Sequence, residues 1–240
     1  MLFFFKEKPL VITAFLPDTL EYINQYSPIK PSSKYIPTWW KQCPKSSFDW
    51  ENHHVNSTVR ACPGFLNNFS LSYLIPLWTD IAISNTNETS KITVADGKTT
   101  YSIHSNSQSP SWYDNFIKIK IDSPWVIESK VNMFLSAPSM FYKEPFPFII
   151  PGGILSPISN LMATNIFTMF KIKNDNNRRD YLLKLNSPFL QLTPMTERRT
   201  ILKTEIITNT EYFKKLSLIG SINNSFIDRG LKLMRIKKNM

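Results

Sequence analysis

The chain has 240 residues, of which 42% are hydrophobic and 13% aromatic, enough apolar surface for one packed domain. Its two cysteines, Cys43 and Cys62, are too few for a disulfide framework, which excludes a disulfide-stapled class and favours a reducing compartment. The formal charge of +10 favours acidic partners, although a coding bias toward lysine explains the same excess. No apolar run approaches the roughly 18 residues of a membrane helix, so we expect no transmembrane segment.

The N-terminal half predicts short elements, because its frequent prolines interrupt longer ones. Leu10 to Phe15 is typical of a first strand, and Asp18 to Tyr26 has the spacing of a short helix. Thr38 to Lys41 fits a single helical turn, and Thr58 to Ala61 fits a short strand. Leu66 to Tyr73 satisfies a helix or an irregular segment equally well.

Further along, the pattern is that of a strand meander. Leu77 to Ile83 alternates as a strand, with Trp78 and Asp80 on one face. Ile92 to Val94 and Thr99 to His104 are predicted to pair as a hairpin, because the Asp-Gly pair between them accepts the positive φ of a tight turn. Asn115 to Ile121 alternates almost perfectly and predicts another strand.

The last part of the chain changes from strands to helices. Residues 205–218 and 221–238 have helical spacing, with basic side chains on one face of the second segment. The strands that precede them are predicted at Val131 to Leu135, Phe148 to Ile150, Ile166 to Lys173, Tyr181 to Leu185 and Phe189 to Leu192.

These elements predict a mainly β fold. We expect an antiparallel sandwich or a distorted, jelly-roll-like barrel, with short helices near the N-terminus and a helical segment at the C-terminus. The expected division is a β-rich domain over residues 1–204 and a helical appendage over residues 205–240, packed on the same domain.

A ligand pocket is one hypothesis for the functional site. Asp80 interrupts an apolar strand, and a buried carboxylate needs a partner, which is either a structural hydrogen bond or a ligand. His104 ends a predicted strand and is followed closely by Gln108. The candidate pocket residues are Trp78, Asp80, His104 and Gln108.

An anion-binding face is a second hypothesis, and a solvated lysine-rich helix is its alternative. Arginines with interleaved aromatic residues suit a single-stranded nucleic acid, which binds by stacking and phosphate contacts. The candidates are Arg178, Arg198, Arg199 and Arg235. We find no motif for catalysis, for a metal or for a known cofactor, so the cofactor is unknown and catalytic and metal-binding residues are predicted as none.

Several short motifs recur in a known order along the chain. They are IPTWWK, TVRACPGF, SYLIPLWTDI, His104 with Gln108, SPWVI and PFLQLTPMTERR. In this order the sequence resembles a family of uncharacterised proteins encoded by tailed bacteriophages and related bacterial sequences. The chain departs from that family at Ser72, where a glycine precedes the tyrosine. The resemblance implies a phage origin and carries no established activity.

Three functional hypotheses follow. The first is a phage-type accessory or virion-associated protein that acts by binding a second copy of itself or a phage protein, in the host cytoplasm or in the virion. The second is a small-molecule enzyme or ligand-binding protein with a pocket around Asp80 and His104, and whether the protein is an enzyme is left open. The third is nucleic-acid binding through the basic face.

Overall fold

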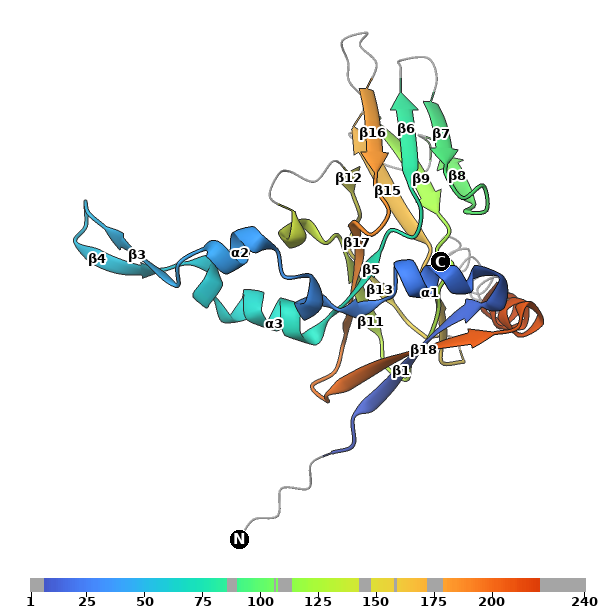
Figure 1. Ribbon diagram of the computed structural model, residues 1–240, viewed down its shortest axis with the longest axis horizontal. Helices are drawn as coiled ribbons and strands as arrows, with labels where there is room; N and C mark the ends of the chain where they lie inside the picture. The colour runs from blue at the N-terminus through green and yellow to red at the C-terminus, as the bar shows by residue number, and fades with distance from the viewer. Residues whose placement is uncertain are drawn as a thin grey trace, which may run out of the picture.

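The computed structural model describes residues 7–85, 90–105, 107, 114–142, 148–157, 159–171 and 179–220. Strands dominate, as predicted, and the helices are few and mostly short (Figure 1). The helices are η1 (Asp18–Leu20), α1 (Glu21–Tyr26), η2 (Ser32–Tyr35), α2 (Thr38–Gln42), η3 (Val59–Ala61), α3 (Pro63–Leu71), η6 (Ser139–Phe141) and the C-terminal helix over 209–220.

The strands form several open sheets rather than a single closed one. The first sheet has the order β14 (Leu161–Ala163), β10 (Val126–Glu128), β1 (Leu10–Pro17) and β18 (Thr200–Ile207). The second has the order β13 (Gly153–Leu155), β11 (Met133–Ser136), β17 (Pro188–Pro194), β5 (Tyr73–Pro76) and β2 (Lys30–Pro31).

Two further sheets and a hairpin complete the described strands. The third sheet has the order β12 (Phe148–Ile149), β15 (Ile166–Lys171), β9 (Phe116–Ile121) and β8 (Tyr101–His104). The fourth has the order β16 (Arg179–Leu183), β6 (Ile81–Asn85) and β7 (Ser90–Val94). The separate hairpin consists of β3 (Ser46–Asp49) and β4 (His54–Ser57).

One apolar core joins the four larger sheets, which makes the body sandwich-like. Each sheet contributes side chains that solvent does not reach, because alternate residues of a strand point to the same face. Examples from the first to the fourth sheet are Ile12, Ile75, Ile119 and Ile81. The body is therefore held together by burial of apolar surface between layers rather than by any one sheet.

The pairing of β1 with β18 corrects the prediction of a helix from Glu205. All eight residues of β18 pair in parallel register with β1, from Leu10 opposite Thr200 to Pro17 opposite Ile207. β-branched residues fill this segment, and their restricted side chains favour a strand over a helix. The helix begins only at residue 209, and the predicted helix over 221–238 lies outside the described residues.

Three other local predictions were also wrong in part. Leu77 to Asp80 is a loop that follows β5, and the strand begins only at Ile81. The predicted strand at Thr58 is the helix η3, which Thr58 caps through a hydrogen bond from Arg60 N.

The Asp96-Gly97 turn exists, with Gly97 at φ 61°, but its flanking strands do not pair with each other. Strand β7 pairs with β6, and β8 pairs with β9. The Asp96 carboxylate accepts hydrogen bonds from the backbone N–H of Lys98 and Thr99, both at 3.0 Å. The turn therefore carries the chain from the fourth sheet to the third.

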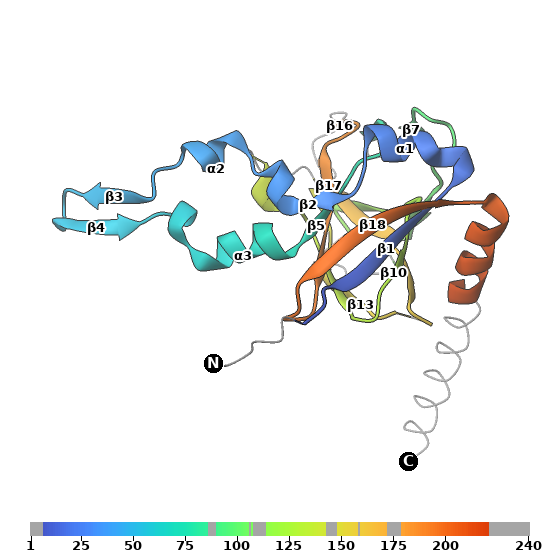
Figure 2. The same cartoon turned by 60° about the horizontal axis from the view of Figure 1, so that its bottom comes forward.

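The most distinctive feature is an arm that projects from the sheets. It comprises residues 36–72, and in both views α2 and α3 lead away from the body to the β3–β4 hairpin at the far end (Figures 1 and 2). Within the described ranges, no helix has both the length and the apolar character needed to cross a membrane.

Candidate functional site

The candidate pocket residues lie in different surroundings. The Trp78 side chain is buried, and its Nε1 donates a 2.8 Å hydrogen bond to Thr99 Oγ1. Asp80 is exposed rather than buried in a strand, and its Oδ1 accepts a 2.6 Å hydrogen bond from Leu185 N. That bond joins the start of β6 to the end of β16, which gives Asp80 a structural partner.

His104 and Gln108 do not join this group in the described part of the chain. The His104 ring lies on β8 with its edge toward Phe167, and their ring centroids are 5.2 Å apart. Gln108 lies outside the described residues. Trp78 lines the pocket described below, and neither Asp80 nor His104 does.

Only two of the four predicted anion-binding arginines, Arg198 and Arg199, lie within the described residues. Arg198 Nη2 donates a 2.6 Å hydrogen bond to Lys8 O, and its Nε lies 3.1 Å from Glu7 Oε2. These contacts tie the turn before β18 to the residues before β1, so this guanidinium has a structural role. Arg199 is exposed beside it, and Arg178 and Arg235 lie outside the described residues. The nucleic-acid face therefore stays a prediction.

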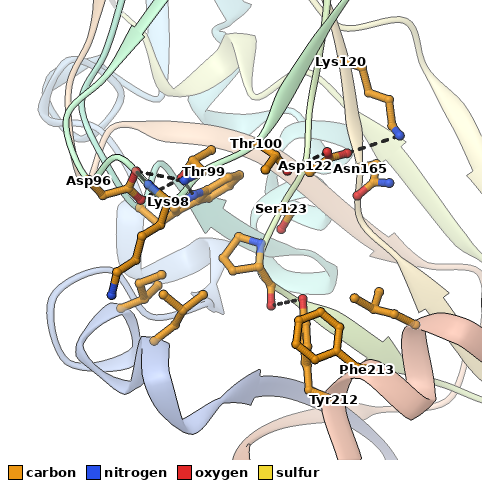
Figure 3. Close-up of a pocket in the computed structure, with 15 residues that line it drawn as sticks. Asp96, Lys98, Thr99, Thr100, Lys120, Asp122, Ser123, Asn165, Tyr212 and Phe213 are labelled. Atoms are coloured by element: carbon orange, nitrogen blue, oxygen red, sulfur yellow. Dashed lines mark hydrogen bonds and ion pairs between the residues drawn. The ribbon is translucent and has the colours of Figure 1, made fainter. Parts of the chain in front are cut away.

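A pocket with a cavity volume of about 420 Å³ lies where distant parts of the chain meet. Figure 3 shows that its wall combines the turn after β7, the end of β9 and the C-terminal helix. Asp122 lies near the middle, where Thr100 Oγ1 donates to its Oδ2 at 2.8 Å and Lys120 Nζ lies 3.2 Å from its Oδ1 (Figure 3). Sequence patterns do not indicate this carboxylate, because it lies in a short loop with no motif around it.

Tyr212 fixes the C-terminal helix against this pocket. Its hydroxyl donates a 2.9 Å hydrogen bond to Pro124 O, and its ring packs in a small cluster with Phe15 and Val126. Burial, with a smaller contribution from the nearby Asp122 carboxylate, raises the pKa of Tyr212 to about 12. The phenol therefore stays neutral at physiological pH and acts as an anchor for the helix.

A separate apolar cluster anchors the base of the arm. Trp40 of α2 packs edge-on against Phe69 of α3 at 5.3 Å between ring centroids, and Phe69 packs in the same way on Phe141 at 5.2 Å. Leu74 of β5 belongs to the same buried cluster. The Trp39-Trp40 pair thus packs at the base of the arm, with Trp40 as its buried member.

Polar contacts brace the arm on both sides of this cluster. At the base, the buried Gln191 side chain on β17 donates hydrogen bonds to Asn68 Oδ1 at 2.9 Å and to Ser72 Oγ at 2.7 Å. Farther out, Arg60 Nη1 donates to Cys43 O at 2.9 Å, and Thr58 N donates to Lys45 O at 3.1 Å. The outer bonds join the outgoing and returning chains of the arm, and the Gln191 bonds join the returning chain to the body.

The tip of the arm carries exposed apolar side chains. Phe48 and Val55 are direct partners across the β3–β4 hairpin, and the ring of Trp50 meets Phe48 edge-on at 4.7 Å. Solvent reaches 80% of Trp50, 66% of Val55 and 45% of Phe48. We name these residues the tip cluster. The sequence analysis did not single out these residues.

The turn at the tip is built by Asp49. Its Oδ1 accepts hydrogen bonds from the backbone N–H of Glu51 at 3.0 Å and of Asn52 at 3.1 Å, and its Oδ2 accepts from Asn52 Nδ2 at 2.9 Å. Mainly through the side-chain and backbone bonds from Asn52, the pKa of Asp49 is lowered from its ordinary value. The hairpin therefore presents Trp50 from a defined turn.

No family model, curated protein or solved structure matches this chain. The resemblance to the phage family therefore stays a prediction. Among the described residues, no group of three or more His, Cys, Asp or Glu is placed to hold a metal ion together. The arm and the pocket are therefore the two features of the structure that bear on function.

Proposed function

We propose that this protein is an accessory or virion-associated component of a tailed bacteriophage, and that it acts by binding another protein through the tip of its arm. The observation that carries the proposal is the exposure of Trp50, at 80%, together with Phe48 and Val55 on a projecting hairpin. Exposed apolar clusters of this kind mark interaction sites, because leaving them in water is unfavourable.

The construction of the arm supports a binding role. A hairpin with only two strands is marginally stable in water, and here its connections to the body are braced by Arg60, Thr58 and the Trp40–Phe69 contact. The bracing holds the tip cluster away from the sheets (Figure 2). Little conformational freedom is lost when such a preformed element docks, which favours affinity.

The composition of the tip supports a protein partner. Tryptophan is enriched among residues that dominate protein–protein binding energies, where it fills a pocket on the other surface. Asp49 and Glu51 flank Trp50, so the tip carries carboxylates in a chain whose net charge is +10. Carboxylates at the contact disfavour the phosphates of nucleic acid, and they favour a protein surface with an apolar cleft and a basic rim.

Photo-crosslinking tests this function. The full chain carries a photoreactive phenylalanine analogue at position 50, or at position 26 as a control, since Tyr26 is an exposed aromatic residue on α1 of the body. Irradiation in extracts of the cells in which the protein is made is expected to give one adduct of defined mass from position 50 only. Excess wild-type protein should suppress it, and excess Trp50→Ser protein should not.

Two results would reject the proposal. One is an adduct that forms equally from positions 26 and 50, because it would not depend on the arm. The other is suppression by the Trp50→Ser protein as effectively as by the wild type. An adduct with twice the mass of the chain would show that the arm binds a second copy of this protein. That result would overturn the proposal that the partner is a different protein.

A further inference from the structure

The pocket in Figure 3 holds hydrogen-bonding groups with capacity to spare. Asp122 uses one oxygen for Thr100 and the other for Lys120, yet about 36% of its side chain remains exposed. A carboxylate offers about four lone-pair sites, and because Oδ1 is buried beside Lys120, the sites left for a ligand are on Oδ2. The Asn165 side chain is exposed, and it has no hydrogen-bond partner among the described residues. Its amide adds donors and an acceptor to the same wall.

The charges in the pocket offset one another. Lys120 is paired with Asp122, and the Asp96 carboxylate is occupied by the N–H groups of its own turn and by Thr99 Oγ1 at 2.7 Å. The remaining amine, on Lys98, lies 5.6 Å from the ring centroid of Tyr22. The two carboxylates and the two amines sum to no net charge, so neither an anion nor a cation gains a net electrostatic attraction there. A neutral ligand therefore gives up no attraction by carrying no charge.

Phe213 gives the pocket an apolar face. Its side chain is 60% exposed, although it lies on the helix that Tyr212 anchors to Pro124, and Leu20 and Leu216 line the same pocket. A purely apolar ligand would cover Asp122 and Asn165 without satisfying them, which costs free energy. The pocket therefore suits a molecule with an apolar face and a hydroxyl-bearing edge.

We propose that this pocket binds a neutral pyranose sugar, with the C–H face of the ring on Phe213 and its hydroxyls on Asp122 and Asn165. The cavity of about 420 Å³ is within the range of about 300–1,000 Å³ found for small-molecule sites. This inference does not depend on the arm, because the tip cluster shares no residue with the pocket.

Saturation-transfer NMR on the full chain tests the proposal. The probes are glucose, galactose, mannose, N-acetylglucosamine and their β-linked disaccharides, with adenosine and inorganic phosphate as competing ligand classes. We expect at least one saccharide to receive saturation at its ring C–H protons, with millimolar or tighter binding. Phe213→Ala and Asp122→Asn should each weaken that binding about tenfold or more, because each removes one of the two recognition elements.

The controls make each outcome decisive. Trp50→Ala changes an even more exposed aromatic residue, on the arm, and should bind the saccharide as the wild type does. Asn165→Ala alters an exposed side chain, so it gives a folded third variant, expected to bind more weakly; thermal unfolding checks all of them. The proposal is overturned if no saccharide binds, if binding is unchanged in Phe213→Ala and Asp122→Asn, or if adenosine or phosphate binds instead.

Discussion

The buried side chain of Gln191 donates a 2.7 Å hydrogen bond to Ser72 Oγ at the place where the arm joins the second sheet. The same amide nitrogen lies 2.9 Å from Asn68 Oδ1 on α3. Gln191 thus links β17 to the returning chain of the arm. Because the contact is buried, its loss leaves polar atoms without water to replace the bond.

Gln191→Leu is expected to lower the free energy of unfolding by about 1–3 kcal/mol, the cost of leaving buried hydrogen-bonding groups unsatisfied. Urea denaturation measures that change, and hydrogen exchange should show faster exchange of the α3 amides. Gln42→Leu is the matched control, because Gln42 is exposed on α2 and should change stability by less than about 0.5 kcal/mol. Equal effects of the two substitutions would reject this role for Gln191.

Trp50→Ser is expected to leave the free energy of unfolding within about 0.5 kcal/mol of the wild type, because an exposed side chain contributes little to the fold. Trp125→Phe should lower it by more than about 1 kcal/mol, because Trp125 is fully buried. Acrylamide quenching of tryptophan fluorescence should fall in the Trp50→Ser protein. It should stay high in the Trp125→Phe protein, which keeps the exposed Trp50. A large destabilisation by Trp50→Ser would mean that its ring belongs to a packed core.

The pattern of the chain predicts most of the fold where local signals and packing agree. Alternation predicted β9, and the apolar spacing that follows Pro17 and Asp18 predicted the short helix after β1. The β18 segment was misread because isoleucines in a short segment fit either a helical or a strand spacing. Only its pairing with β1, about 190 residues away in the chain, decides the matter, and no local pattern carries that information.

The tip cluster was not predicted from the sequence, and of the pocket residues only Trp78 was named. The exposure of Trp50 depends on the arm leaving the body, which is a tertiary property. Trp78 lines this pocket without Asp80 or His104, and Asp122 and Phe213 reach it from segments about 90 residues apart in the chain. Side chains that come together from distant segments of the chain form no recognisable motif along the sequence.

The turn at the tip should lose stability in acid. Because its hydrogen bonds lower the pKa of Asp49 in the folded turn, the turn is stabilised above the ordinary value of 3.8. This stabilisation is lost as the pH falls through the lowered value, where the carboxylate gains a proton. The indole N–H shift of Trp50, followed by NMR as the pH is lowered, measures it. Asp49→Asn should remove this transition, and its persistence in that variant would assign it to another group.

Tyr212 predicts a loss of stability at alkaline pH. Its pKa rises from 10.0 to about 12 in the fold, so the neutral phenol stabilises the protein fully below pH 10. That contribution, roughly 1–3 kcal/mol, is lost as the pH rises toward 12 and the buried phenol ionises. Urea denaturation between these pH values, compared with Tyr212→Phe, isolates the effect, because the variant lacks the ionisable group. Parallel curves for the two proteins would show that Tyr212 titrates normally.

The affinity for the partner that position 50 captures tests the central claim most directly. Isothermal titration calorimetry should give a dissociation constant about 30-fold or more higher for Trp50→Ala than for the wild type, because an interface tryptophan of this kind contributes about 2 kcal/mol or more. Tyr26→Ala, which removes an exposed aromatic side chain from α1, should bind as the wild type does. Equal affinities for Trp50→Ala and the wild type would show that the arm is not the binding element.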